Sequence, residues 1–230
     1  MNREPDLTEL QQRLGYQFRQ SELLSLALTH RSRSSRNNNE RLEFLGDAYL
    51  GYVVGEELYR RHDQAKENEL TLLRASLVRG RTLAELGRSI GLGDFLRLGT
   101  GELKSGGFRR DSILSDAVEA IIGAVLLDGG QQPARALILH LLGTRLDRAR
   151  PGAVAKDPKT RLQEYLQGRG VELPTYQVED VEGSDHAQTF RVTCTIAPLE
   201  ISAEGRGRSR RQAEQQAAAA ALDSLGEADT

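Results

Sequence analysis

The chain has almost no cysteine, which excludes a scaffold held together by disulfides. Cys194 is the only cysteine among 230 residues, so no internal disulfide can form. Hydrophobic residues make up 38% of the chain, which is enough for ordinary globular cores. We therefore expect one large domain or two modest ones.

Long apolar runs are also absent. No segment approaches the roughly 18 consecutive apolar residues that suggest a membrane-spanning helix. The charged start, MNREPDLTEL, lacks the apolar centre of a secretory signal. We expect no membrane partner and a cytoplasmic location.

An excess of basic residues is missing too. The 31 Lys and Arg residues are outnumbered by 33 Asp and Glu residues, for a formal net charge of -2. A nucleic-acid partner usually shows itself through a basic excess, and total charge gives no such indication. The placement of the charges is therefore more informative than their sum.

Residues 1–148 are predicted to form an all-helical domain. From Leu7 to about Arg148 the apolar residues recur at helical spacing, without convincing strand alternation. Ser21 and Asp111 are predicted to start helices as N-caps, and Gly129 with Gly130 is predicted to end the second of these helices.

A linker is predicted at residues 149–156, because this stretch contains Pro and Gly and has no periodic pattern. Asp157 and Pro158 then read as the N-cap and first residue of a helix that stops at Gly168 or Gly170.

Three antiparallel strands and a helix follow that first helix of the second domain. Apolar alternation predicts strands around Tyr176 and Val178, then over 190–196, then from Leu199 to Ala203, with a turn at 183–185. Residues 209–225 return to helical spacing, with small alanines suited to close packing on a sheet. Residues 157–226 are thus predicted as an α-β-β-β-α domain.

Acidic residues cluster in two segments, NERLEFLGDA (39–48) and SDAVEAIIGA (115–124). At about 100° per residue, Glu40, Glu43 and Asp47 fall within roughly 60° of one another on a helix. Asp116 and Glu119 form a second pair, three residues apart. Like charges this close destabilise a helix unless a cation lies between them.

The second acidic pair lies in a strongly apolar segment, which predicts a central helix. Buried carboxylates are costly, and a divalent cation with oxygen ligands offsets that cost. Mg²⁺ fits best, because no His or Cys spacing suggests zinc. Spacing alone leaves a commoner alternative open, in which the acids form a solvated helix face or pair with Arg41, Arg74 and Arg79.

The nine residues NERLEFLGD (39–47) resemble the signature of the bacterial ribonuclease III family. GELKSGGFRRDSILSDAVEAIIGA (101–124) resembles the second family block, and the α-β-β-β-α tail resembles the family's RNA-binding domain. The resemblance implies an all-α endonuclease domain followed by a small α+β domain that binds double-stranded RNA.

The resemblance also implies residue roles. Glu43, Asp47, Asp116 and Glu119 become the metal-binding set, with Asp47 and Glu119 the most indispensable catalytic residues. Glu40 and Glu67 match further family acids that give support at the dimer interface or the scissile strand.

The implied activity is Mg²⁺-dependent cleavage of double-stranded RNA by a homodimer, in which each subunit cuts one strand. Cleavage would leave 5′ phosphates, 3′ hydroxyls and short 3′ overhangs, and would process ribosomal RNA precursors and some mRNAs. No histidine lies in the acidic blocks, so a histidine mechanism through a cyclic phosphate is not expected.

RNA contacts are expected from three elements of the second domain, since double-stranded RNA is recognised through its shape, 2′-hydroxyls and phosphates. The first is the helix face with Thr160, Gln163 and Glu164, and the second is the loop with His186. The third is a basic helix start, which resembles an anion site but by itself also fits a solvated helix end; it comprises Arg206, Arg208, Arg210 and Arg211.

Two questions stay open at this point. The first concerns the basic residues near the acids, which either track phosphates or are solvated: His30, Arg31, Arg33, Arg36, Lys104, Arg109 and Arg110. The second concerns an alternative function, a regulator that binds double-stranded RNA without cutting it. Four retained acids argue against the regulator, because clustered negative charge beside RNA does not help a pure binder.

Overall fold

The computed structural model describes residues 6–152, 157–183 and 188–226. The chain divides into two compact units, residues 1–154 and 155–230, and each has its own hydrophobic core. Of the linker predicted at 149–156, residues 153–156 lie outside the described residues.

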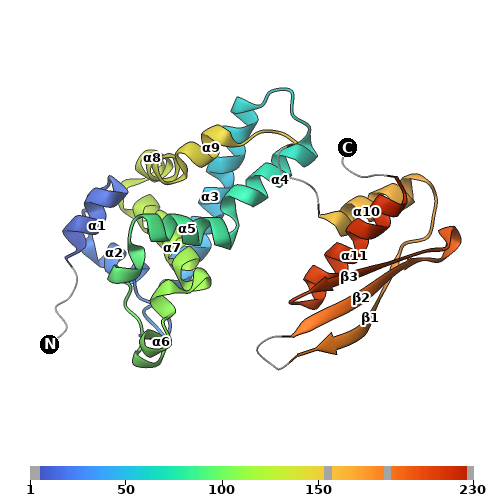
Figure 1. The fold of residues 1–230 in the computed structure, drawn as a ribbon. Helices are drawn as coiled ribbons and strands as arrows, with labels where there is room; N and C mark the ends of the chain where they lie inside the picture. The colour runs from blue at the N-terminus through green and yellow to red at the C-terminus, as the bar shows by residue number, and fades with distance from the viewer. Residues whose placement is uncertain (1–5, 153–156, 184–187, 227–230) are drawn as a thin grey trace. The chain divides into compact units, whose positions relative to one another are not determined.

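In the described part of the first unit, the regular elements are helices (Figure 1), apart from one isolated bridge between Thr29 and Arg97. This confirms the all-helical prediction. The α-helices are α1 (Leu7–Leu14), α2 (Ser21–Ala27), α3 (Glu40–Arg61), α4 (Glu67–Val78), α5 (Gly80–Ser89), α6 (Thr100–Lys104), α7 (Asp111–Gly129), α8 (Gln131–Leu142) and α9 (Thr144–Arg148), with 3-10 turns η1 (Leu92–Phe95) and η2 (Gly107–Arg109).

Helix α7 is the centre of this unit, as its apolar sequence predicts. It is buried around most of its circumference and packs against α2, α3, α5 and α8. An apolar helix surface gains free energy wherever other helices remove it from water, so the most apolar helix takes the central place.

Helices α3 and α7 cross so closely that their backbones touch. A Cβ atom on Gly46 would lie 1.8 Å from the carbonyl oxygen of Glu119, and one on Gly123 would lie 2.2 Å from the carbonyl oxygen of Leu42. Neither position has room for a side chain. Glycine on both helices therefore sets the distance between them.

The two predicted helix starts are one residue too late. Ser21 and Asp111 are the first residues of α2 and α7 rather than their N-caps. The Asp111 carboxylate pairs with Arg88 instead of capping the backbone, and its charge still favours the positive helix end. Gly129 is the last residue of α7, as predicted.

The second unit has the predicted α-β-β-β-α order (Figure 1). Its antiparallel sheet has the strand order β1-β2-β3, with Cys194 at the centre opposite both Tyr176 and Ala203. The elements are α10 (Pro158–Gly168), β1 (Thr175–Glu182), β2 (Thr189–Ile196), β3 (Ile201–Gly207) and α11 (Arg210–Ser224), with 3-10 turn η3 (Ala197–Leu199).

Helix α10 starts as predicted, because Asp157 Oδ1 accepts a hydrogen bond from the backbone N–H of Lys159 at 2.9 Å. Leu199 was predicted within the third strand, and this was wrong. It lies in η3 and is exposed, since the neighbouring Pro198 has no N–H to donate to a strand ladder. Of the predicted turn at 183–185, residues 184 and 185 lie outside the described residues.

Small side chains bring α11 close to the sheet. Ala213, Ala217, Ala218 and Ala221 are all fully buried in the core of the second unit. This is the packing role predicted for the alanine-rich segment.

In the described residues of both units, no helix has the length and apolar character needed to cross a membrane.

We predict that Gly46→Ala lowers the free energy of unfolding by about 3 kcal/mol, because its methyl group would force α3 away from α7. Gly51→Ala is the matched control on the same helix. No atom lies within 4 Å of its added Cβ, so helix propensity should stabilise it by up to about 1 kcal/mol. Urea unfolding measures both, and equal stabilities would show that the crossing tolerates a side chain.

Candidate functional site

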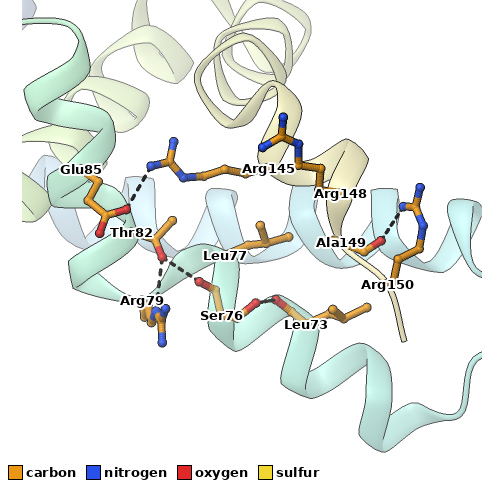
Figure 2. Close-up of a pocket in the computed structure, with 10 residues that line it drawn as sticks. All are labelled: Leu73, Ser76, Leu77, Arg79, Thr82, Glu85, Arg145, Arg148, Ala149 and Arg150. Carbon is orange, nitrogen blue, oxygen red and sulfur yellow. Dashed lines mark hydrogen bonds and ion pairs between the residues drawn. The ribbon is translucent and has the colours of Figure 1, made fainter. Parts of the chain in front are cut away.

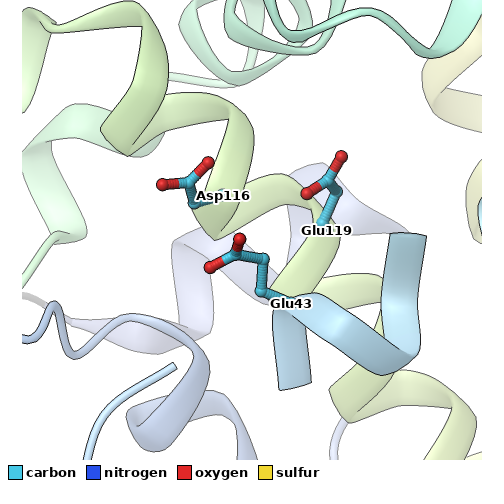
Figure 3. Close-up of side chains that lie close together, drawn as sticks. All are labelled: Glu43, Asp116 and Glu119. Atoms are coloured by element: carbon cyan, nitrogen blue, oxygen red, sulfur yellow. The ribbon is translucent and has the colours of Figure 1, made fainter. Parts of the chain in front are cut away.

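Three carboxyl groups from two helices come together in the first unit. Glu43 projects from α3, and Asp116 and Glu119 project from α7. One oxygen of each lies within 4.8 Å of the others, and Figure 3 shows the three side chains gathered around a shared space. This spacing suits three oxygen ligands around one divalent cation.

Helix geometry and the glycine crossing produce this three-carboxylate cluster. Asp116 and Glu119 are three residues apart, so they share one face of α7. Gly46, almost one turn after Glu43, lies against the carbonyl of Glu119. The acid of α3 is thereby held opposite the acids of α7.

Asp47 was predicted as a fourth ligand, and it lies outside the three-carboxylate cluster. It is exposed and follows Glu43 by one helical turn. Its charge is nevertheless the one that raises the pKa of Glu119 most, ahead of the charges of Glu43 and Asp116. Asp47 therefore belongs to the same electrostatic site.

Burial and mutual repulsion raise the pKa values of the cluster. Burial first, and then the charges of Asp47, Glu43 and Asp116, raise the pKa of Glu119 from 4.5 to about 8. Burial and then the charge of Asp116 raise the pKa of Glu43, and burial raises that of Asp116. Without a bound cation, Glu119 therefore holds a proton at neutral pH.

The spacing left open whether arginines neutralise the cluster, and they do so only in part, since the charge of Arg31 lowers the pKa values of Glu43 and Asp116 against the larger effect of burial. Among the described residues, none of its carboxylates, nor that of Asp47, forms an ion pair. Arg41 and Arg74 are exposed. Only the neighbouring acid Glu40 is paired, with Arg31 at 3.6 Å. The site therefore has a deficit of positive charge that a metal ion would fill.

The two supporting acids occupy different places. Glu40 is the first residue of α3 and lies beside the cluster, where its charge also raises the pKa of Glu43. Glu67 is the first residue of α4, beyond the far end of α3, and accepts a hydrogen bond from the Thr71 hydroxyl at 2.8 Å. The structure brings Glu40 to the cluster and leaves Glu67 away from it.

A cavity of about 510 Å³ opens beside the cluster, with acids and bases on its walls. Of the basic residues whose role the sequence left open, His30, Arg31 and Arg110 line it, whereas Arg33, Arg36, Lys104 and Arg109 do not. Its full lining is His30, Arg31, Ser32, Asn39, Glu40, Glu43, Glu102, Arg110, Ser112, Ile113 and Asp116.

The basic wall of this cavity is held in place by short-range contacts. Arg110 pairs with Glu102 at 2.6 Å, and His30 Nδ1 lies 2.8 Å from the Ser32 hydroxyl. The Ser32 hydroxyl also accepts a hydrogen bond from the backbone N–H of Gly99 at 2.9 Å. These side chains therefore face the cavity from segments that are bonded to each other.

A second cavity, of about 370 Å³, lies between α4, α5 and α9 (Figure 2). Its lining includes four arginines and a single carboxylate, Glu85, which pairs with Arg145 at 3.0 Å. The excess of positive charge on this surface disfavours a cation. Of these two cavities, only the first has several carboxylates on its walls.

The predicted RNA-contact residues of α10 share its outer surface. Thr160, Gln163 and Glu164 are exposed and lie three and four residues apart, hence on one side of the helix. His186 lies outside the described residues.

The four predicted arginines of the second unit are exposed but do not all lie at the helix start. Arg206 is on β3, Arg208 follows the strand, and Arg210 and Arg211 open α11. The Ser209 hydroxyl caps α11 by accepting from the backbone N–H of Gln212 at 3.2 Å.

Sequence reasoning missed an aromatic stripe along α3. Phe44 is 80% exposed, Tyr52 62% and Tyr59 73%. At about 100° per residue these rings fall within roughly 80° of one another, away from the buried side of the helix. Their helical spacing could have revealed the stripe, but nothing in the sequence says that this side faces outward.

Two family models match the chain. One, described as Ribonuclease-III-like, matches residues 20–146, and the other, described as Double-stranded RNA binding motif, matches residues 158–225. This chain belongs to the ribonuclease III family. It is an endoribonuclease that carries a double-stranded-RNA-binding domain, and the resemblance stated from its signature is confirmed.

Full-length relatives agree with this assignment. Ribonuclease 3 of Vibrio cholerae is 55% identical over 221 residues, covering 96% of this chain and 98% of that protein. Ribonuclease 3 of Pseudomonas aeruginosa (strain LESB58) is 56% identical over 220 residues, covering 96% of each.

Solved structures agree as well. The nuclease domain of ribonuclease III from Campylobacter jejuni is 45% identical, with a TM-score of 0.60 over 60% of this chain and 97% of that one. Membership of this family indicates a divalent metal, and the three-carboxylate cluster is compatible with one.

The raised pKa of Glu119 predicts a pH-dependent stability for the metal-free protein. The folded state keeps a proton up to about pH 8 that the unfolded state loses near pH 4.5, so this stability contribution is lost as pH rises between those values. Glu119→Gln should therefore match the parent near pH 4.5 and exceed it by about 1–2 kcal/mol above pH 8, after allowance for solvent screening.

Denaturant unfolding in EDTA at a series of pH values measures this difference. Asp63→Asn, in an exposed loop, serves as the control, and it should show no such growing gain. A gain for Glu119→Gln that does not change with pH would contradict the argument.

Proposed function

We propose that this endoribonuclease cleaves double-stranded RNA in a Mg²⁺-dependent reaction and leaves 5′ phosphates, 3′ hydroxyls and short 3′ overhangs. The observation that carries the proposal is the three-carboxylate cluster, which lacks a neutralising cation and borders a cavity with basic walls. Family membership supports the nuclease, and the second domain supports the duplex substrate.

The residues of the cluster fit Mg²⁺. All the ligands are carboxylate oxygens, which Mg²⁺ prefers, and their raised pKa values mark a place where positive charge would be stabilised. When bound, Mg²⁺ would supply positive charge beside the scissile phosphate and would lower the pKa of a water molecule, so that the water could lose a proton and attack phosphorus.

We assign the residue roles on this basis. Glu43, Asp116 and Glu119 would hold the ion directly, and Asp47 would complete the metal-binding set. Asp47 and Glu119 are proposed as the indispensable catalytic pair, with family membership and the effect of the Asp47 charge on the pKa of Glu119 as the support. Arg31 and Arg110, on the cavity wall, would bind phosphate oxygens.

We propose that the active form is a homodimer joined through the aromatic stripe of α3, which is defined by Phe44, Tyr52 and Tyr59. Exposed rings along one helix lose their contact with water when a second copy covers them. The Campylobacter jejuni nuclease domain has a region involved in dimer formation. A two-fold dimer would present two equivalent sites to the two strands of a duplex, one for each of the proposed staggered cuts.

The supporting acids take their proposed roles from this dimer. Glu40 lines the cavity and would lie beside the scissile strand. Glu67 lies away from its own cluster, so we propose that it acts at the dimer interface.

In the second domain, we propose that the polar face of α10 contacts 2′-hydroxyls in the minor groove, as does the loop containing His186. The arginines of β3 and α11 would contact phosphates. Ribosomal RNA precursors and some mRNAs, met in the cytoplasm, are the proposed substrates, and family membership is the support for them.

Cleavage of an end-labelled duplex RNA tests the activity. We expect cutting with Mg²⁺ but not with EDTA, and a loss of roughly a thousandfold or more in Glu119→Gln, because the ion loses a charged ligand. Duplex binding should survive in the variant, and Asp63→Asn should cut normally. Binding without cutting by the parent chain would instead favour the regulator.

Light scattering after gel filtration tests the dimer. Phe44→Asp should shift the chain toward monomer by at least tenfold in dissociation constant, because a charge would enter an apolar contact. Leu103→Asp on α6 is the matched control, since Leu103 is also exposed but lies off the stripe. An unchanged dimer in Phe44→Asp would place the interface elsewhere.

A further inference from the structure

Glu214 is an acid in the middle of the basic surface of the second unit. Its Oε2 atom lies 2.7 Å from Lys159 Nζ on α10, and its Oε1 atom accepts a hydrogen bond from Arg210 Nε at 2.9 Å. Only 13% of the Glu214 side chain is exposed. The carboxylate therefore joins the two helices that carry the proposed RNA contacts.

Lys159 is held on a second side as well. Its ammonium lies 4.3 Å from the centre of the Tyr176 ring, a favourable cation–π distance. Asp157 caps α10 and also accepts a hydrogen bond from the Gln215 side chain. These links hold the start of α10 against α11 independently of Glu214, and the Tyr176 ring gives Lys159 a second partner.

The four exposed arginines are consequently not equivalent. Arg210 forms an ion pair with Glu214. Hydrogen bonds from Lys159 and then from Arg210 lower the pKa of Glu214, so its carboxylate stays ionised at neutral pH. Among the described residues, Arg206, Arg208 and Arg211 have no ion-pair partner. A phosphate that approaches Arg210 must compete with Glu214, whereas one that approaches Arg211 does not.

We propose that Glu214 is a positioning residue that withholds Arg210 from RNA phosphates and thereby limits the affinity and salt dependence of duplex binding. This inference rests on the proposed binding of double-stranded RNA. A limited affinity suits a nuclease, because product release often sets the turnover rate and cut duplexes must leave.

The test uses the full-length chain in EDTA, where RNA is bound but not cut, with fluorescence anisotropy of a labelled duplex over a series of KCl concentrations. Glu214→Gln keeps the shape of the side chain and removes its charge. We expect the slope of log Kd against log salt to steepen by the amount that corresponds to about one additional phosphate contact. Binding at low salt should tighten roughly three- to tenfold.

Asp223→Asn is the matched control. It also removes one negative charge, from an exposed position in the last turn of α11, 13 residues after Arg210 and so roughly 20 Å away along the helix. Its slope should equal that of the parent. In the double variant Glu214→Gln with Arg210→Gln the slope should return to the parent value, which identifies Arg210 as the released charge.

Thermal unfolding of each variant separates misfolding from altered binding. If Glu214→Gln fails to fold, single variants still decide the matter, because Arg210→Gln should weaken binding less than Arg211→Gln. A folded Glu214→Gln with the parent slope, or equal losses in the two arginine variants, would overturn the inference. Absence of duplex binding by the parent chain would overturn the proposed function itself.

Discussion

The site depends on one close contact, the crossing of α3 and α7 at Gly46 and Gly123. Carboxylates repel each other, so Glu43 would be further from Glu119 if the helices were free to separate. Backbone contact and the apolar surroundings of α7 supply the free energy that keeps the acids together. A buried helix crossing is therefore what brings two ordinary acidic helix faces together in the proposed metal site.

The two units use acids in opposite ways. In the first, three carboxylates meet without an arginine between them, and their pKa values rise. In the second, Glu214 meets Lys159 and Arg210, and its pKa falls. The first arrangement favours binding of a cation, and the second reduces the positive charge that is free to contact RNA phosphates. The balance of charge around each acid, rather than the net charge of the chain, sets its role.

Much of the fold could be predicted from the sequence, because local rules decide it. Helical and strand periodicities reflect which side of an element is buried, and Asp157 with Pro158 marks a helix start through its own backbone bonds. The wrong predictions concern a side chain that pairs with a residue distant in the sequence and a residue whose neighbour prevents strand pairing. Asp111 pairs with Arg88, 23 residues away in the chain, and Pro198 keeps Leu199 out of the strand ladder.

By itself the sequence determined which acids share a helix face, because that depends only on 3.6 residues per turn. Whether arginines reach those acids, and which acids from different helices meet, was decided by tertiary structure alone, because such distances depend on how the helices cross. The crossing gathers Glu43, Asp116 and Glu119, leaves Asp47 at the edge and keeps Glu67 away. The same holds for Phe44 and Glu214, whose exposure and partners come from helix packing rather than from spacing along the chain.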